Sequence, residues 1–396
     1  MNAVTKISGM VLFTIIMLTT IGYAQDNTGV IFKSNPASTP KSSNGKFEHN
    51  TFGRIIADWS MGSNGNSIDD FSGASFREAF IGVKGDVTNS IEYIFEVNFA
   101  GGKTSIDDAY VKFKTEDWAV IVGKSKVPNS LEWNTSLGQI SFLERAAFKS
   151  AFSFARGFGI KAVTGGQNWG FSAGIFQGDD KFSGGKEGYT GAARFTVGGN
   201  INKTTWLAGV SGRARDIKDN GMIKYTTRGI TNLSMVMTNF ESNATKENLA
   251  AFETAFTSGS LFGSAEYVIS NAKDGIAKDI DANFSGGYVE IGYILTGESR
   301  TIDIMAGKWQ RPKVTNPVDK NGNGLWMISV RYDTLNLTNG GDFGGEQRSY
   351  VAGISWYMTS YVRATFNYGI TKVNSRSSFG TAQVANIIGA RLSVDW

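Results

Sequence analysis

Positively charged side chains recur at every second position in several short stretches of the chain. Lys112 and Lys114 are two residues apart, and so are Arg213 and Arg215. Residues with this spacing point to the same side of a β-strand. An arginine fork donates two hydrogen bonds to an oxyanion and a lysine adds a point charge, so such a row could bind small anions. The predicted strand register places further basic and acidic residues on the same side: Arg194, Arg331, Arg363, Arg391, Glu92, Glu96, Asp108, Asp333 and Asp395.

Other kinds of chemistry find little support in the sequence. The chain has no cysteine and a single histidine, His49, which disfavours thiolate or multi-histidine metal sites and Ser-His-Asp catalysis. Asp319 and Asn321 match the start of a calcium loop, but Val330 occupies the position of its final glutamate. Basic residues are scattered rather than clustered beside aromatic ones, so we expect no nucleic-acid partner. We predict no enzyme, metal or cofactor; a hydroxyl-dependent hydrolase is the enzymatic alternative and would need a base.

The first 24 residues have the features of a secretory signal peptide. Lys6 supplies a positive charge, residues 9–21 are mostly apolar, and Gly22 and Ala24 are small residues near the expected cleavage point. The apolar stretch is shorter than the roughly 20 residues of a membrane-spanning helix. We predict cleavage after Ala24, followed by a flexible periplasmic segment over residues 25–46, which lacks periodicity.

From residue 47 onward, apolar and polar residues alternate. In residues 91–99, Tyr93, Phe95 and Val97 are apolar while Glu92 and Glu96 are charged, and similar alternation recurs across the chain. The mean hydropathy of −0.17 resembles that of a soluble protein. Lipid-facing and water-facing residues cancel in such an average when they alternate, so the pattern favours a membrane β-barrel.

The C-terminal strand gives the clearest pattern. Ile388, Leu392 and Trp396 share one predicted face, whereas Arg391 and Asp395 share the other. A terminal aromatic residue on such a strand is similar to the signal that the bacterial barrel-assembly machinery reads. We therefore predict that Trp396 ends a lipid-facing row and binds this machinery.

The number of strands and the placement of aromatic residues define the expected architecture. About eighteen segments qualify as strands, and a closed bacterial barrel needs an even number. We predict a transmembrane antiparallel barrel over residues 47–396 with sixteen strands, surrounded by outer-membrane lipids, the remaining segments lying in an inward-folded loop or the lead-in. Aromatic residues near strand ends fit the two membrane interfaces; these are Trp59, Trp118, Trp169, Trp206, Tyr357 and Trp396.

Several sequence segments together point to one protein family. They occupy residues 76–80, 95–102, 107–111, 122–128, 142–145, 156–159, 293–300, 331–333, 353–357 and 366–368. In sequence and order, they resemble the phosphate-selective porin O and P family over most of the chain.

The resemblance implies a sixteen-stranded homotrimeric porin of the bacterial outer membrane that takes up small anions passively, phosphate above all. It also implies that residues 126–156 fold into the barrel as a constriction loop, with Lys124, Lys126 and Arg145 near the narrowest point. The other cations that we expect along the pore are Arg77, Arg213, Arg215, Lys224, Arg228 and Arg331.

Departures from the family pattern leave two functional hypotheses open. Arg77 is followed by Glu78, where the family often has a second arginine. The cations from Arg213 to Arg228 are also loosely spaced, and each predicted cation could be neutralised by a carboxylate. The first hypothesis is a channel for small anions with a preference for phosphate. The second is a general diffusion porin with weak or no phosphate selectivity.

Overall fold

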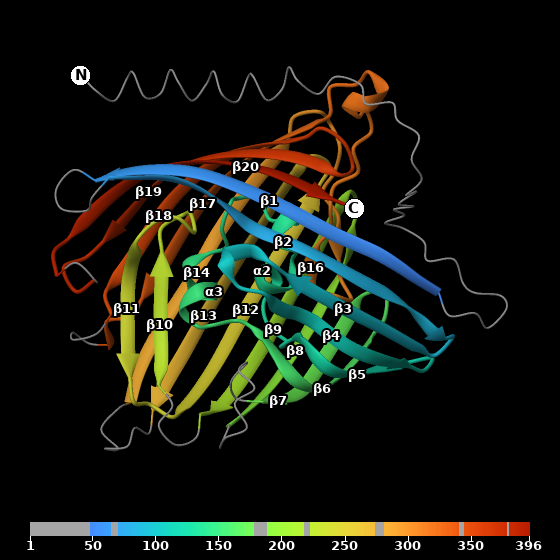
Figure 1. Ribbon diagram of the computed structural model, residues 1–396, viewed down its shortest axis with the longest axis horizontal. Helices are drawn as coiled ribbons and strands as arrows, with labels where there is room; N and C mark the ends of the chain where they lie inside the picture. The colour runs from blue at the N-terminus through green and yellow to red at the C-terminus, as the bar shows by residue number, and fades with distance from the viewer. Residues whose placement is uncertain are drawn as a thin grey trace. The chain divides into compact units, whose positions relative to one another are not determined.

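The computed structural model describes residues 48–64, 70–177, 188–217, 222–273, 281–339, 344–377 and 380–396. Within these ranges, sixteen strands form one closed antiparallel barrel (Figure 1). The predicted fold class and strand number are therefore confirmed. The predicted signal peptide (residues 1–24) and the following lead-in (residues 25–46) lie outside the described residues.

The barrel strands follow one another around the ring in chain order, apart from two small hairpins that are not part of it. The barrel strands are β1 (Glu48–Asn64), β2 (Phe71–Thr88), β3 (Ile91–Asn98), β4 (Ser105–Lys114), β5 (Trp118–Lys126), β6 (Arg156–Gly165), β7 (Trp169–Gln177), β8 (Tyr189–Ile201), β9 (Thr204–Asp216), β12 (Lys246–Ser258), β13 (Leu261–Lys273), β14 (Asp281–Ile294), β17 (Leu325–Asn336), β18 (Glu346–Tyr357), β19 (Val362–Val373) and β20 (Gln383–Asp395). A short 3₁₀ turn, η1 (Ala100–Gly102), joins β3 to β4.

The last strand closes the barrel by pairing with the first. β1 and β20 are antiparallel partners, and the backbone groups of Gly53 and Trp396 exchange two hydrogen bonds of 3.1 Å. Leu392 is 42% exposed on the outer surface, whereas Arg391 is 5% exposed inside. The two predicted faces of the C-terminal strand are therefore confirmed, and closure gives every described strand of the barrel wall a partner on each side.

The outer surface is apolar because outward positions alternate with inward polar ones. In β14, Val289 and Ile291 are exposed outside, while Glu290 between them is buried inside. Among the described residues, no helix is both long and apolar enough to span a membrane.

The predicted placement of aromatic residues is only partly right. Trp118 and Trp169 are exposed at the first residues of β5 and β7, as expected for an outer-surface position at a strand end. The prediction for Tyr357 was wrong, because this residue is fully buried on the inner face of β18. Its ring lies 4.7 Å from the guanidinium of Arg363.

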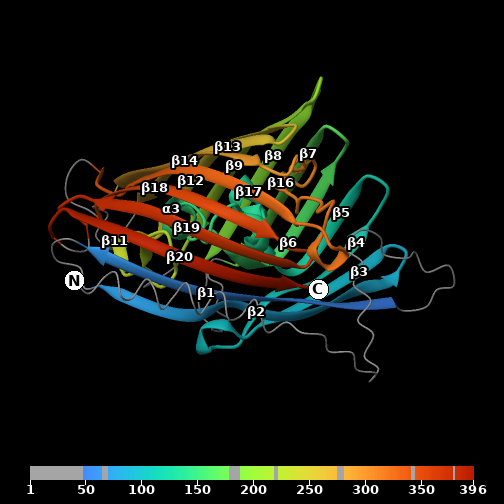
Figure 2. The ribbon, with the colours of Figure 1, turned by 90° about the horizontal axis from the view of Figure 1, so that it is seen from above.

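Three connections fold into the barrel interior. The inner loop (residues 127–155) joins β5 to β6 and contains α2 (Leu131–Asn134), η2 (Leu137–Gln139) and α3 (Ala147–Ala151). The inner hairpin (residues 222–245) joins β9 to β12 and consists of β10 (Ile223–Arg228) and β11 (Val236–Ser242). The inner turn (residues 295–324) joins β14 to β17 and contains β15 (Ile302–Asp303), β16 (Lys308–Trp309) and η3 (Val318–Lys320). Ile302 of β15 and Trp309 of β16 are buried, whereas η3 is exposed. Figure 2 shows α3 among the barrel strands.

Apolar packing holds the inner loop and the inner hairpin together. Phe152 of the inner loop meets Tyr225 of β10 edge to face, with ring centroids 5.2 Å apart. Phe148 stacks on Tyr288 of the barrel wall, with ring centroids 6.2 Å apart. These residues belong to one buried cluster that also includes Phe240 of β11. The folded-in segments therefore fill part of the interior and fix the side chains that border what remains open.

Candidate functional site

The barrel wall holds the inner loop through hydrogen-bond acceptors on successive strands. The amide N–H of Glu132 donates to Glu266 at 2.7 Å, that of Leu143 to Asn367 at 2.7 Å, and that of Ala147 to Asp333 at 2.8 Å. The hydroxyl of Ser141 donates to Glu290. Buried acceptors of this kind satisfy backbone groups that would otherwise be unpaired. Of the carboxylates predicted for the lumen, Asp333 thus anchors the inner loop, together with Glu266 and Glu290.

Several predicted lumen arginines serve the same attachment. Arg331 donates to the carboxylate of Glu132 and to the carbonyl of Glu144, both at 2.6 Å. Arg363 donates to the carbonyl of Ile140 at 2.7 Å. Both guanidiniums are buried and have partners from the inner loop. The charge of Arg331 is compensated by Glu132, whereas the partners of Arg363 are neutral.

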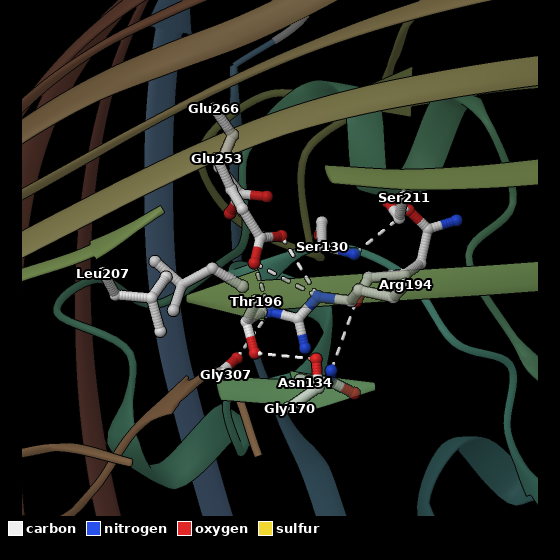
Figure 3. Close-up of polar contacts among 12 residues, drawn as sticks. Ser130, Asn134, Gly170, Arg194, Thr196, Leu207, Ser211, Glu253, Glu266 and Gly307 are labelled. Atoms are coloured by element: carbon white, nitrogen blue, oxygen red, sulfur yellow. Dashed lines mark hydrogen bonds and ion pairs between the residues drawn. The ribbon is translucent and has the colours of Figure 1, made fainter. Parts of the chain in front are cut away.

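The inner turn is attached through Arg194 of β8. Figure 3 shows its guanidinium between the carboxylate of Glu253 and the backbone of Gly307. The distances are 3.1 Å from Nε to Glu253 and 2.7 Å from an amino group to the Gly307 carbonyl. On the neighbouring strand β9, the hydroxyl of Ser211 bonds Asn129 at the start of the inner loop at 3.0 Å. The two inserts are therefore fixed to adjacent parts of the wall.

A β-bulge in β2 turns two neighbouring side chains toward the interior. The register with β1 shifts between Ile56 and Ala57, and such a shift places two residues of one strand opposite one residue of the other. Arg77 then donates to Glu144 of the inner loop at 2.5 and 3.1 Å. Its neighbour Glu78 accepts from Arg54 at 3.1 Å. The acidic residue beside Arg77 therefore pairs with a different arginine.

Three cations surround the ring of Trp133 in α2. The charged groups of Lys126, Lys149 and Arg145 lie 4.9, 5.0 and 5.5 Å from the ring centroid. Lys126 donates to the carbonyl of Trp133 at 2.8 Å, and Arg145 donates to that of Thr135 at 2.7 Å. Among the described residues, no carboxylate forms an ion pair with Arg145 or Lys149. Aromatic rings attract cations through their electron-rich faces, but they do not cancel the charge.

Burial and mutual repulsion affect the ionisation of these inner-loop groups. Burial, reinforced by the charges of Arg145 and Arg77, lowers the pKa of Lys149 to about 7. Burial also lowers the pKa of Arg145 to about 10. Burial alone would raise the pKa of Glu144, but the neighbouring Arg77 outweighs it and holds that pKa below its usual value. An anion placed beside Lys149 and Arg145 would favour their charged forms.

The free space beside these cations is a cavity of about 380 Å³, which we call the chamber. The inner loop, the inner hairpin and the strands β2, β17 and β18 all contribute to its lining. Five basic residues line it, namely Arg77, Arg145, Lys149, Arg228 and Arg331, against two acidic residues, Glu144 and Asp333. The chamber therefore offers positive charge in excess to a solute inside the barrel.

Comparison with known proteins assigns the chain to a family. The family model described as phosphate-selective porin O and P matches residues 50–396. The chain belongs to this porin family. It is accordingly a channel protein of the bacterial outer membrane. The resemblance inferred from the sequence segments is confirmed.

Individual relatives are distant. An uncharacterized protein of Caulobacter vibrioides is 28% identical over 82% of this chain and 68% of its own length. Porin O of Pseudomonas aeruginosa is 26% identical over 31% of this chain and 29% of its own length. Among solved structures, OprB of Pseudomonas putida has a TM-score of 0.60 at 9% identity and covers 88% of this chain and 94% of its own. An anion-selective porin from Comamonas acidovorans has a TM-score of 0.56 at 10% identity and covers 89% of this chain and all of its own (100%). These structures share the fold.

The predicted site residues of this porin fall into separate groups. Arg77, Arg145, Arg228 and Arg331 come together at the chamber, and Lys126 lies behind it on Trp133. Arg213 and Arg215 lie elsewhere, where both pair with Glu247, at 2.5 and 2.8 Å. Lys224 is exposed and pairs with Glu241 at 3.3 Å.

Lys124 lies on the other side of the porin wall. It pairs in register with Ala109 and Phe158, and Phe158 is 61% exposed on the outer surface. Directly opposed residues of neighbouring strands share a face, so the side chain of Lys124 belongs to the outer face. The structure does not bring it together with the chamber cations.

Sequence reasoning missed Lys149, which is central to the chamber. The inner loop has no period-two pattern that could assign its side chains to a face. The available signal was the basic spacing of Arg145 and Lys149, four residues apart on either side of the start of α3. Arg145 precedes the helix, so the spacing alone does not bring the two side chains together; both lie over the ring of Trp133.

One part of the porin lumen is acidic. Arg156 at the start of β6 is surrounded by Glu96, Asp107 and Asp108, at 3.7, 3.7 and 3.0 Å. A register shift between β3 and β4 brings the two aspartates to this point. The lumen is therefore divided into a cationic region at the chamber and a region where carboxylates outnumber their basic partner.

Proposed function

We propose that this outer-membrane channel passes small anions, inorganic phosphate among them, and that the chamber provides its anion selectivity. The observation that supports the proposal is that Arg145 and Lys149 line the chamber without a carboxylate partner among the described residues. A permeating anion can exchange part of its hydration for such groups. Several moderate sites of this kind allow it to enter and leave again.

The proposed selectivity residues comprise two sets. Arg145, Lys149 and Arg228 act on the ion directly from the chamber wall. Arg77, Arg331 and Lys126 act through their electric field and through the position of the inner loop. Arg77 and Arg331 already pair with carboxylates, and Lys126 is not part of the chamber lining. Arg213, Arg215 and Lys224 form a separate group outside the chamber lining.

Reversal potentials in planar bilayers test anion selectivity. Purified protein under a potassium chloride gradient should give a potential of the sign expected for chloride permeation. Cation preference would contradict the proposal.

Phosphate preference is the finer part of the proposal and rests on the names of the family and of Porin O. A specific observation favours the alternative of a general diffusion pore: the acidic group around Arg156 leaves the lumen mixed. Adding phosphate to a chloride solution distinguishes the two. A phosphate-preferring channel loses chloride current in a concentration-dependent manner, whereas a general pore shows little block.

A single substitution connects the selectivity to the chamber. Lys149→Gln removes one charge, and a unit charge about 5 Å from an ion in water contributes roughly 0.8 kcal/mol, or about fourfold in a ratio. We expect the anion-to-cation permeability ratio to fall about fourfold at pH 6. Lys112→Gln is the matched control, because Lys112 pairs with Glu92 at 3.0 Å and does not line the chamber. Equal effects of the two variants would remove the chamber from the proposal.

We also propose that three copies assemble and that the outer face around Lys124 lies in their interface. An OmpT structure of Vibrio cholerae titled as a trimer form shares the fold, with a TM-score of 0.53. A lysine facing lipid costs roughly 2–4 kcal/mol at the middle of a membrane, and an interface between copies offers it polar partners. Light scattering in detergent should give three copies for the wild type, and Lys124→Glu should reduce that number. An unchanged trimer in the variant would exclude this face.

The barrel-assembly machinery is the further partner that we propose, through Trp396. The ring of Trp396 lies against Gly53, and its backbone pairs with the same residue. Deletion of Trp396 should reduce the amount of folded barrel in the outer membrane, while Trp396→Phe retains it. Normal assembly of the deletion variant would contradict this assignment.

A further inference from the structure

We propose that the chamber binds a phosphate ester that carries several hydroxyl groups, such as a sugar phosphate, more tightly than inorganic phosphate. The inference rests on the proposed anion function and names the class of solute that fits the chamber best. Three properties of the chamber lining support it: volume, division of charge, and buried acceptor atoms without partners.

The chamber is larger than inorganic phosphate requires. Its volume of about 380 Å³ lies within the roughly 300–1,000 Å³ typical of small-molecule sites. One water occupies about 30 Å³ in the liquid, so the five heavy atoms of inorganic phosphate fill less than half of the chamber. The remaining space, together with the open side of the chamber, accommodates a hydroxylated group attached to the phosphate.

The lining changes in character from one contributing element to another. Arg77, Arg145 and Lys149 come from β2 and the inner loop and supply positive charge. Apart from Arg228, the inner hairpin and β18 contribute neutral polar side chains: Ser349, Gln347, Thr226, Thr227, Thr231 and Asn232. Thr227, Gln347 and Ser349 of this set bond to one another. A charged end and a neutral hydroxylated end of one solute match this division.

Two buried acceptor atoms in the lining have no hydrogen-bond partner among the described residues. They are Oδ1 of Asn232 and Oδ1 of Asp333. Each of these side chains has its other polar atom engaged, since Asn232 Nδ2 donates to Ser75 at 3.4 Å and Asp333 Oδ2 accepts from the Ala147 amide at 2.8 Å. A buried acceptor without a partner is unfavourable, so both atoms favour a ligand that brings hydroxyl donors.

Inorganic phosphate can bond to the cations of the lining but not to its unpartnered acceptor atoms. Its dianion is almost entirely an acceptor, so it bonds to the cations and is repelled by an acceptor such as Asp333. A sugar phosphate supplies the same acceptor oxygens at one end and several O–H donors at the other. The chamber offers donors to the first end and vacant acceptors to the second, which is the basis of the expected preference.

Block of chloride current through the full-length channel in planar bilayers tests the inference. Glucose 6-phosphate, inorganic phosphate and glucose are titrated separately over the same concentration range, and the concentration of each that halves the chloride current is measured. We expect glucose 6-phosphate to block at a concentration about tenfold lower than inorganic phosphate, which corresponds to about 1.4 kcal/mol. Glucose alone should have no effect, because it lacks the charged end.

Two variants locate the effect within the chamber. Asn232→Ala should raise the half-blocking concentration of glucose 6-phosphate toward that of phosphate and leave the phosphate value unchanged. Lys149→Gln should weaken block by both anions. Asn200→Ala is the matched control, because Asn200 accepts from Thr205 at 2.6 Å in an exposed part of β8 and does not line the chamber.

The outcomes distinguish this inference from the function on which it rests. Equal block by phosphate and glucose 6-phosphate, or a preference that persists in Asn232→Ala, overturns the inference while anion selectivity stands. Comparable block by glucose would also overturn the inference, because the size of the solute rather than its charge would then determine the block of chloride current. A cation-selective reversal potential would instead contradict the proposed anion function itself.

Discussion

The wall arginines, which we define as Arg213 and Arg391, differ from the chamber cations Arg145 and Lys149 in what lies opposite them. Arg391 donates to Asp58 at 2.6 and 2.7 Å, and Arg213 donates to Glu247 at 2.9 Å. The chamber cations meet an aromatic ring and, for Arg145, backbone carbonyls. A lumen cation therefore stabilises the fold where the chain supplies a counter-charge, and stays available to a solute where it does not.

The largest expected effect comes from breaking a wall pair. Asp58→Ala leaves the buried Arg391 with only the more distant carboxylate of Glu144, at 3.7 Å, and both side chains of the Asp58–Arg391 pair are almost completely inaccessible. Breaking such a pair costs about 3–5 kcal/mol. Urea unfolding followed by tryptophan fluorescence should show this loss for Asp58→Ala. The double variant Asp58→Leu with Arg391→Met should recover much of it. Unchanged stability of the single variant would mean that the wall arginines do not differ from the chamber cations in this way.

Reversing a chamber charge should change selectivity rather than stability. Lys149→Glu alters the charge by two units, twice the effect of neutralisation, which corresponds to roughly fifteenfold in the permeability ratio at a distance of about 5 Å in water. Reversal potentials at pH 6 measure this change, and the unheated barrel should keep its mobility on a gel. A stability loss as large as that of Asp58→Ala would contradict the division between the two groups.

Selectivity should also depend on pH through Lys149. Its pKa is lowered to about 7, first by burial and then by Arg145 and Arg77, with Glu144 opposing. The lysine is charged below this pH and neutral above it, so anion selectivity should be higher at pH 5.5 than at pH 8.5, by up to about fourfold on the same Coulomb estimate. The difference should disappear in Lys149→Gln. If the selectivity of Lys149→Gln still depended on pH, lumen carboxylates rather than Lys149 would be the titrating groups.

The smallest effect is expected at an exposed pair. Lys224 and Glu241 lie 3.3 Å apart on the inner hairpin with side chains 56% and 40% exposed. Solvent-exposed pairs contribute little, so Lys224→Gln should leave the permeability ratio unchanged and the unfolding free energy within about 0.5 kcal/mol. A clear loss of anion selectivity would extend the functional group beyond the chamber.

Much of the architecture could be predicted because the alternation of side chains acts locally. The alternation of apolar and polar residues within a strand indicates which side chains face outward. It is clearest in β20, where Leu392 lies outside and Arg391 inside. The site was less accessible to prediction. Lys124 was grouped with Lys126 and Arg145 by nearness in sequence, yet its register places it on the outer face. Lys149 lies in a loop without periodicity, and its role depends on Trp133, sixteen residues earlier in the chain.

The sequence by itself determined an antiparallel barrel, a last strand that ends at Trp396 and the supply of inward cations, because a period of two assigns a side chain to a face regardless of distant residues. Which sixteen of the roughly eighteen candidate segments form the wall was decided by the fold. Only the tertiary structure decided which cations remain available. The inner loop folds back onto the wall, and the bulge beside Ile56 directs Arg77 toward Glu144. Compensation of a charge depends on the group that the fold places within a few ångströms, and that group comes from a remote part of the chain.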